Sequence, residues 1–420
     1  MYQRRHVKEM IDLILNDNAM RIIAATGPRQ TGKTTIATQA CDQLNQLGFL
    51  TWYIPLDNTE HDISEYTTGM RAMRVGKKPD AEMLINIWQN ARIASKKSDH
   101  GLILVFDEIQ TIPGWSNHVK SLWDKDRREG YKVRPVILGS AAWRMLIGIN
   151  ESLAGRFITQ KITHWSYREI TECFHLSVDE YIFFGGYPGA FYSRQSEKRQ
   201  DYWHNYIQTS IMAPIFDRDI MGLTRIRKPV LMRRLMDLAP SLSGQLISYN
   251  KLLGQLQDKG NSTTIANYLD LLSDAGILTC LSRYTTRPHV GKASSPKLNV
   301  LNTALMTAGS GHSFPSVLNH NADWGRIVES AVGAHLLNSS SFTLKIHYWR
   351  DEPHEVDYIV SRGSDLLGIE VKSGSSTKKG GLNAFKRKFP KAKTMIVGPN
   401  GIPLNDFFSL TADEWLEEEE

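Results

Sequence analysis

The segment from residue 27 to residue 34 constrains this chain more than any other, because its letters GPRQTGKT fit the phosphate-binding pattern G-x-x-x-x-G-K-[ST]. The run 21–25 before it predicts a strand, and the run 35–39 after it predicts a helix. Glycines let the backbone curl so that its N–H groups point at phosphate oxygens at a helix N-terminus. The sequence therefore predicts a nucleoside triphosphate site. The predicted contacts come from Gly27, Pro28, Arg29, Gln30, Thr31, Gly32, Lys33, Thr34 and Thr35.

Two acidic residues follow a second apolar run and complete the expected nucleotide site. The run 102–106 predicts a buried parallel strand, and Asp107 and Glu108 stand at its end. We expect ATP and Mg²⁺ as ligands, with Lys33 on the β- and γ-phosphates and Thr34 on the metal ion. Asp107 is then the metal-side carboxylate, and Glu108 is the general base.

A hydroxyl ends a third predicted strand, over 134–139. Ser140 stands where a polar side chain could orient the attacking water. A glycine-serine turn that simply leaves the strand is an equally good interpretation of this pair. The sequence leaves both open.

Length and composition set the scale of the molecule. With 420 residues, of which 41% are hydrophobic, the chain exceeds one typical core, so we expect two or three domains. A net charge of +6 and a pI near 9.0 favour a polyanionic partner such as DNA, although an ordinary basic surface has the same charge. The three cysteines show neither metal nor disulfide spacing, and no apolar stretch approaches the roughly 18 residues that cross a membrane. We therefore expect a soluble, cytoplasmic protein with no membrane contact.

The middle of the chain predicts helices and one candidate DNA-reading fold. Residues 167–219 are rich in aromatic side chains without interleaved basic ones, which favours a helical lid over the nucleotide with an aromatic core. Amphipathic helices over 247–256 and 261–272, then a strand over 277–281, outline a winged helix-turn-helix. The second helix has no Arg or Lys from 265 to 272, so contact between subunits competes with base reading.

A second set of charged residues lies nearer the C-terminus. Two predicted strands, joined by a turn at 362–365, would bring Asp357 close to Glu370. The Glu-x-Lys alternation puts Glu370 and Lys372 on one face of a strand. Carboxylate oxygens suit Mg²⁺, the lysine could orient or deprotonate a water, and a predicted helix upstream would add Glu329 as a third acidic ligand. An exposed charge pair on an edge strand is the alternative.

Basic residues gather after this set. Such a run beside carboxylates favours contact with a phosphate backbone over a salt-bridged surface. The run comprises Lys378, Lys379, Lys386, Arg387, Lys388, Lys391 and Lys393.

The strand, phosphate loop, paired acids and polar strand end together resemble the AAA superfamily of ATPases, and GPRQTGKTT is similar to one prokaryotic branch of it. The segment 151–156 and the turn 185–189 extend the resemblance over most of the chain. The resemblance implies an ATPase that assembles into a ring, as a hexamer, in which Arg156 reaches the γ-phosphate of the neighbouring subunit. Arg144 is a second candidate, and a surface salt bridge is the alternative role for either arginine.

The C-terminal set resembles the PD-(D/E)xK nuclease superfamily, in which a helix glutamate, a hairpin aspartate and a Glu-x-Lys strand form the site. Glu329, Asp357, Glu370 and Lys372 fill those places. The resemblance implies a Mg²⁺-dependent nuclease fold, and many relatives keep that fold as a binding module.

These features predict an α/β chain with a P-loop AAA ATPase domain over 1–165 and a helical lid and connector over 166–228. A winged helix-turn-helix over 229–290 and an α/β PD-(D/E)xK nuclease-like domain over 291–420 follow. We expect an ATP-driven DNA-processing protein whose AAA motor is coupled to a domain that binds or cuts DNA. One alternative is a DNA-dependent ATPase, helicase or branch-migration factor with a catalytically silent nuclease fold. Another is a nucleotide-controlled switch that binds a protein partner.

Overall fold

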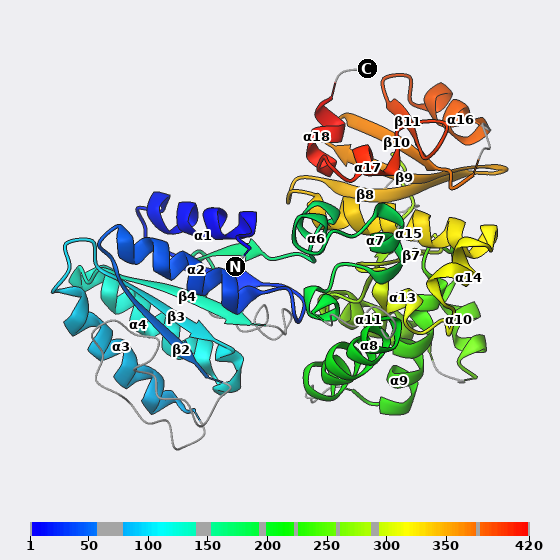
Figure 1. Cartoon of the computed structure of the whole chain (residues 1–420). Helices are drawn as coiled ribbons and strands as arrows, with labels where there is room; N and C mark the ends of the chain where they lie inside the picture. Colours follow the sequence, from blue (N-terminus) through cyan, green and yellow to red (C-terminus); the bar gives the residue numbers. More distant parts are fainter. Residues whose placement is uncertain are drawn as a thin grey trace. The chain divides into compact units, whose positions relative to one another are not determined.

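The chain divides into two compact units, Met1–Ile162 and Thr163–Glu420, in the computed structural model (Figure 1). Ser140, Arg144 and Lys378 lie outside the residues that the structure describes. The described residues are 2–56, 79–139, 153–192, 199–221, 226–257, 261–286, 294–374 and 379–418.

The first unit is built on a parallel sheet with the strand order β2-β3-β4-β1-β5 (Figure 1). Leu104 and Phe106 of β3 pack with α3 and α4, whereas Ile103 and Val105 pack with α1 and α2. Because helices cover both faces, the central strands are continuous apolar runs, as predicted. The strands are β1 (Ile22–Thr26), β2 (Leu50–Pro55), β3 (Leu102–Asp107), β4 (Val133–Gly139) and β5 (Phe157–Lys161). The helices are α1 (Arg5–Asn16), α2 (Lys33–Gln46), α3 (Ala81–Ser95), the short η2 (Ile109–Thr111) and α4 (Trp115–Glu129).

The strand order decides where the nucleotide residues lie. β4 stands between β1 and β3, and all three strands run in the same direction. The loop after β1 and the acids after β3 therefore share the carboxyl edge of the sheet, where open α/β sheets bind ligands.

The second unit begins with helices. Two of them start with a reciprocal capping box, Ser166 with Glu169 and Ser177 with Glu180, which satisfies the free N–H groups of their first turns. Phe183, Phe184 and Trp203 are buried among the other aromatic residues of this region, in agreement with the predicted aromatic core. The helices are α6 (Tyr167–Phe174), α7 (Val178–Phe184), η3 (Pro188–Phe191), α8 (Arg199–Tyr206), η5 (Ile207–Met212), η6 (Ile215–Ile220), α9 (Pro229–Leu238) and η7 (Ala239–Leu242).

Two helices and a two-stranded ladder follow in the predicted order. α10 (Tyr249–Gln255) and α11 (Ser262–Asp274) precede β6 (Leu278–Leu281), which pairs antiparallel with β7 (Lys297–Val300). Ser248 and Asn261 cap the two helices by accepting backbone N–H groups. The interpretation of this region as a winged helix stays a prediction.

The C-terminal part holds a four-stranded sheet in the order β11-β10-β9-β8. β8 with β9 and β9 with β10 are antiparallel, whereas β10 and β11 are parallel and are joined through α16. A parallel pair needs such a crossover. The elements are α13 (Ala304–Thr307), α14 (Phe314–Leu318), α15 (Asn321–Ser339), β8 (Lys345–Asp351), β9 (His354–Arg362), β10 (Asp365–Val371), α16 (Gly380–Lys388), β11 (Lys393–Val397), α17 (Leu404–Phe407) and α18 (Ala412–Glu417).

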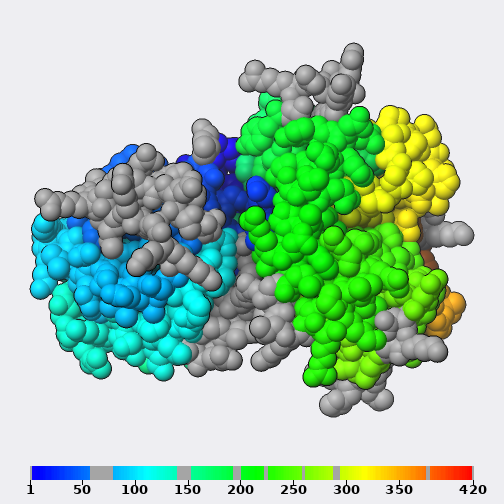
Figure 2. All heavy atoms as spheres, turned by 90° about the horizontal axis from the view of Figure 1, so that it is seen from below, coloured from blue at the N-terminus to red at the C-terminus, as the bar shows by residue number. Residues whose placement is uncertain are grey.

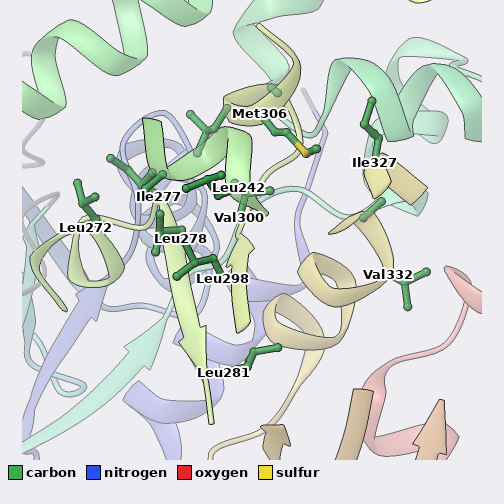
Figure 3. Close-up of a cluster of buried hydrophobic side chains, with 14 of the residues drawn as sticks. Leu242, Leu272, Ile277, Leu278, Leu281, Leu298, Val300, Met306, Ile327 and Val332 are labelled. Carbon is green, nitrogen blue, oxygen red and sulfur yellow. The ribbon is translucent and has the colours of Figure 1, made fainter. Parts of the chain in front are cut away.

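One hydrophobic cluster runs through the second unit, from Ile182 to Leu416. Figure 3 shows Leu278 and Leu298 of the ladder and Val332 of α15 among its members. On the face seen in Figure 2, the green segments that include α8 and α9 form most of this unit's surface. The predicted domain limits at 166, 229 and 291 stay predictions, and the segments on either side of 229 and of 291 share this core.

Within the described ranges, no helix is both long and apolar enough to span a membrane. Cys41, Cys173 and Cys280 are free thiols.

Candidate functional site

The loop between β1 and α2 has the backbone that phosphate binding needs. A Cβ added at Gly27 would lie 2.0 Å from the Ile162 carbonyl oxygen, so the chain passes where a larger residue would clash. Gly32 has a φ of 89°, a left-handed conformation that glycine adopts without strain, and it is the N-cap residue of α2. The helix N-terminus therefore opens directly onto the loop, where its N–H groups and dipole favour an anion.

Two basic side chains line this loop. Lys33 Nζ donates to the carbonyl oxygens of Gly27 at 3.0 Å and Pro28 at 2.7 Å. Arg4, which lies just before α1 and is buried, donates from Nη1 to the Thr31 carbonyl at 2.8 Å. The loop thus contacts one ammonium group and one guanidinium group through its backbone carbonyls.

Asp107 lies at the same edge and faces two hydroxyl groups. Thr34 Oγ1 donates to Asp107 Oδ2 at 2.7 Å, and the buried Tyr53 of β2 donates from its hydroxyl to the same oxygen. Hydroxyl and carboxylate oxygens are hard ligands, which fit Mg²⁺ with one or two protein groups and a substrate phosphate. Thr34 and Asp107 are the residues that would hold it.

Glu108 follows Asp107 in a left-handed conformation, with a φ of 56°. Its N–H donates to the Leu138 carbonyl at 3.0 Å, and its carboxylate accepts a hydrogen bond from Gln110 Nε2. The turn places this carboxylate after the strand end, next to the metal-side residue. Its role as general base stays a prediction.

The second set of predicted residues meets on the C-terminal sheet. Asp357 of β9 accepts the Val371 N–H through Oδ2 at 2.8 Å, at the end of β10. Glu370 Oε1 accepts a hydrogen bond from Lys372 Nζ at 2.5 Å. The predicted hairpin and the predicted common face of Glu370 and Lys372 are therefore confirmed.

A lysine that the sequence did not suggest joins this cluster. Lys297, the first residue of β7, is completely buried, and its Nζ forms an ion pair with Glu329 of α15. The same ammonium lies 3.7 Å from Asp357 Oδ1 and donates to the Asp357 carbonyl oxygen at 3.2 Å. It also lies 4.7 Å from the centre of the Tyr358 ring. We refer to Lys297, Glu329, Asp357, Glu370 and Lys372 as the acidic cluster.

The pKa values in the acidic cluster follow from burial and from these charges. Burial, then the Asp357 charge, raises the pKa of Glu329 to about 7 against the effect of Lys297. Burial alone would lower the pKa of the Lys297 ammonium, but the Asp357 and Glu329 carboxylates outweigh it and raise that pKa. Burial and Asp357 also raise the pKa of Glu370. Burying these carboxylates in their charged form therefore costs free energy, and the positive charge of Lys297 reduces that cost.

These contacts do not fit a Mg²⁺ ion held by the three carboxylates. Lys297 contacts Glu329 and Asp357, and Lys372 takes one oxygen of Glu370. In the described part of the chain, no group of three or more His, Cys, Asp or Glu side chains is arranged to hold a metal ion. Glu370 Oε2 is buried and has no hydrogen-bond partner among those residues.

Part of the predicted basic run contacts other groups of the chain. Lys388 pairs with Asp351 at 2.5 Å, Lys386 donates to the Ala392 carbonyl, and Lys393 donates to the carbonyls of two C-terminal residues. Lys379, Arg387 and Lys391 are exposed, as is the paired Lys388. The surface available for a phosphate backbone is therefore smaller than the sequence suggested.

Three family descriptions match successive parts of the chain. Residues 19–171 match a family described as AAA domain. These residues form an AAA-type P-loop ATPase domain. Residues 175–316 and 324–406 match two families described as domains of unknown function, DUF8612 and DUF4143. Lys297 falls in the first of these two and its carboxylate partners fall in the second. No curated protein matches the chain.

Solved structures show a distant likeness. A Walker-type ATPase of Pyrococcus abyssi is similar over 74% of this chain and 96% of its own, with 14% identity and a TM-score of 0.48. DnaA from Aquifex aeolicus bound to AMPPCP covers 64% of this chain and 88% of its own, with 14% identity and a TM-score of 0.31. Cdc6p from Pyrobaculum aerophilum is similar over 68% of this chain and 90% of its own, with 14% identity and a TM-score of 0.30.

Arg156 lies at the amino edge of the AAA sheet. Its carbonyl accepts the Ile22 N–H at the start of β1, whereas the phosphate loop follows the other end of that strand. Its guanidinium pairs with Asp124 of α4 through two hydrogen bonds, of 2.7 and 3.2 Å. Arg156 is therefore remote from the phosphate loop of its own AAA domain, and contact with a nucleotide in a neighbouring subunit stays a prediction. The alternative of a surface salt bridge describes its contact in this structure.

Three residues of the two sites were missed in the sequence. Tyr53 has only a weak signal, an aromatic residue in an apolar run before the acidic strand, and Arg4 has none. Lys297 could have been noticed because it stands in a short run, Pro296–Val300, whose other residues suggest a buried strand. A lysine in such a place needs an acidic partner.

Proposed function

We propose that this chain is an ATP-hydrolysing protein that acts on DNA. Its first unit would be the AAA motor, and its second unit would carry a nuclease-like domain that holds or cuts DNA. The observation that carries the proposal is the 2.7 Å hydrogen bond between Thr34 and Asp107, because it joins the phosphate loop and the acidic strand end at one place. P-loop ATPases need both parts together for phosphoryl transfer to water.

The residues of the AAA domain divide the work of hydrolysis. Lys33 would move from the loop carbonyls to the β- and γ-phosphates and offset their charge. Glu108 would accept a proton from the water that attacks the γ-phosphorus, and Ser140 would orient that water. When bound, Mg²⁺ supplies positive charge to the phosphate oxygens. ADP then leaves with the electrons of the broken bond between the β-γ bridging oxygen and the γ-phosphorus.

Assembly into a ring is part of the proposal. Arg156 lies at the sheet edge opposite the phosphate loop, so it could act only on the nucleotide of another subunit. A fixed guanidinium fork suits the charge that develops on the transferred phosphoryl group. We propose a hexameric ring, in which the Asp124 pair would open when a neighbour binds ATP.

DNA is proposed as the partner because of the second unit. The proposal is supported by the order of α15, which carries Glu329, and the β9–β10 hairpin, which carries Asp357 and Glu370, because the resemblance to PD-(D/E)xK nucleases implies a helix, a hairpin and a Glu-x-Lys strand in this order. Exposed Arg387 and Lys391, together with the net charge of +6, favour a polyanion. The outward side of α11 would add contacts if this region is a winged helix.

The acidic cluster favours a second form of the same function. Its carboxylates are engaged by Lys297, Lys372 and the Val371 N–H. A nuclease-like domain in this state would hold DNA without cutting it. The protein would then be a DNA-dependent ATPase, such as a helicase or branch-migration factor.

The test is ATP hydrolysis in Mg²⁺ with no DNA and with single-stranded, duplex or branched DNA. We expect the wild-type rate to rise with at least one DNA and to fall at least about 100-fold in Lys33→Ala. Lys8→Ala, at an exposed position on α1, is the matched control. A Lys33→Ala rate close to wild type would contradict the ATPase assignment. A rate that no DNA changes, with no DNA bound, would leave the nucleotide-controlled protein switch as the better function.

A further inference from the structure

Lys297 is placed by the fold in an environment that a lysine rarely occupies. All four residues of β7 are buried, and the Lys297 side chain has no exposed area. Burying an ammonium without partners costs several kcal/mol or more, so its position must be stabilised by opposite charge. Glu329 and Asp357 supply that charge from two different elements, and the Tyr358 ring lies against the same ammonium.

We propose that the Lys297 ammonium is the resident cation of the acidic cluster and stands where a divalent metal ion would otherwise be held. The identity of the cluster as a nuclease-like site rests on the proposed function. The chain would thus supply its own cation from strand β7, and the cluster would not bind Mg²⁺ or Mn²⁺.

The surroundings of Lys297 leave little room to rearrange. The Tyr358 hydroxyl donates to the Glu329 carbonyl at 2.8 Å and lies 2.7 Å from Asn299 Oδ1. A Cβ added to Gly333 of α15 would lie 2.2 Å from that same Asn299 oxygen. Helix α15, β7 and β9 are therefore packed closely around the ammonium, which cannot easily withdraw to admit a metal ion.

The charges of the acidic cluster lead to the same conclusion. Its three carboxylates face two ammonium groups. Lys297 lies beside Glu329 and Asp357, and Lys372 lies beside Glu370. A divalent ion bound to Asp357 would lie close to Lys297 and would be repelled by it. The cluster then serves to hold the β6–β7 ladder to the C-terminal sheet. This contact links the regions matched by the two families of unknown function.

Manganese binding tests the proposal directly. The bound fraction of Mn²⁺ is measured by electron paramagnetic resonance on the full chain, without nucleotide and in an Asp107→Asn background that removes the phosphate-loop metal site. We expect no Mn²⁺ binding that depends on Asp357 below about 1 mM. With Lys297→Met added, we expect the chain to bind one Mn²⁺ at least about tenfold more tightly than the chain that keeps Lys297. This binding should disappear when Asp357→Asn is also added.

The outcomes are distinct. Mn²⁺ bound by the chain with Lys297 intact, and lost in Asp357→Asn, would overturn the proposal. A folded Lys297→Met variant that gains no Mn²⁺ would also overturn it. If that variant fails to fold, Lys297→Met with Glu329→Gln removes both charges of the closest pair and leaves Asp357 and Glu370 to bind the ion. Lys345→Met, at an exposed position on β8, is the matched control and should leave Mn²⁺ binding unchanged. Neither ATP nor DNA enters this measurement, so the ATPase and DNA-binding proposals can stand if it fails.

Discussion

The phosphate-loop site and the acidic cluster contain the same kinds of residue but pair them differently. In the first unit, the Asp107 carboxylate receives hydrogen bonds from two neutral hydroxyls, those of Thr34 and Tyr53. In the second unit, Glu329 and Glu370 accept from ammonium groups. Both sites combine lysine with acid.

The difference shows how the surroundings of a carboxylate determine its role. A carboxylate that accepts from neutral donors keeps its negative charge for a cation that arrives with a substrate. A carboxylate that is paired with a buried lysine has already received its cation. Sequence motifs report which acids are present, whereas these partners decide whether a metal ion can bind.

The largest expected effect separates the two lysines by stability. Lys297→Met should destabilise the second unit by about 3–5 kcal/mol, because it leaves buried carboxylates without their partner. Lys33→Met should cost the first unit only about 1–2 kcal/mol, because Lys33 donates to the backbone carbonyls of Gly27 and Pro28 and not to a buried carboxylate. Urea unfolding measures both losses of stability when it is monitored by hydrogen exchange in β9 for the second unit and in β1 for the first. Equal losses would remove the distinction between the sites.

Activity separates the two glutamates. Glu108→Gln should lower kcat for ATP hydrolysis by about 10²–10³-fold and leave ATP binding intact, because it removes the general base alone. Glu370→Gln should change kcat less than about twofold, since Glu370 belongs to the other unit. Steady-state hydrolysis and a nucleotide-binding titration give both values. Hydrolysis that survives in Glu108→Gln would transfer the base role to another residue.

Acid should weaken the first unit through His6. Burial, then Arg4 and Arg5, lowers the pKa of His6 to about 2, so the folded state needs the neutral ring. Its contribution to stability is present above the unfolded pKa of about 6.5 and is lost as pH falls, by about 2 kcal/mol at pH 5. The raised pKa of Glu329 acts in the opposite direction in the second unit, where stability is lost as pH rises toward about 7.

Urea unfolding at pH 7.5 and pH 5, with His6→Gln beside the wild type, tests this opposition. In the variant, the first unit should lose less stability between pH 7.5 and pH 5, and the stability of the second unit should be unchanged. If the first unit of His6→Gln loses as much stability at pH 5 as the wild type does, groups other than His6 cause the loss.

The smallest expected effect concerns Tyr53. Tyr53→Phe removes one of the two hydroxyl donors to Asp107 Oδ2, a change of about 0.5–1.5 kcal/mol. The Mg²⁺ concentration for half-maximal ATP hydrolysis should rise about threefold to tenfold, because the carboxylate is held less firmly. Tyr131→Phe, outside this site, is the control. An unchanged Mg²⁺ dependence would leave Thr34 as the partner that matters.

Local pattern was sufficient for much of the fold and for half of the candidate site. The phosphate loop, the acids after β3 and the hairpin that joins Asp357 to Glu370 were all predicted, because each depends on residues close in sequence. Strand order, core sharing and the partners of Arg156 were not, because they depend on how distant elements pack.

The sequence by itself determined the phosphate loop and the start of the helix that follows it, since backbone curvature and helix start are local properties of GPRQTGKT. It also determined that acids and a lysine meet on the C-terminal hairpin. Only the tertiary structure decided that Tyr53 steadies Asp107 and that Lys297, 60 residues before Asp357, is the cation beside it. The physical reason is that the energy of a charge depends on its burial and on its neighbours in space, which no spacing along the chain specifies.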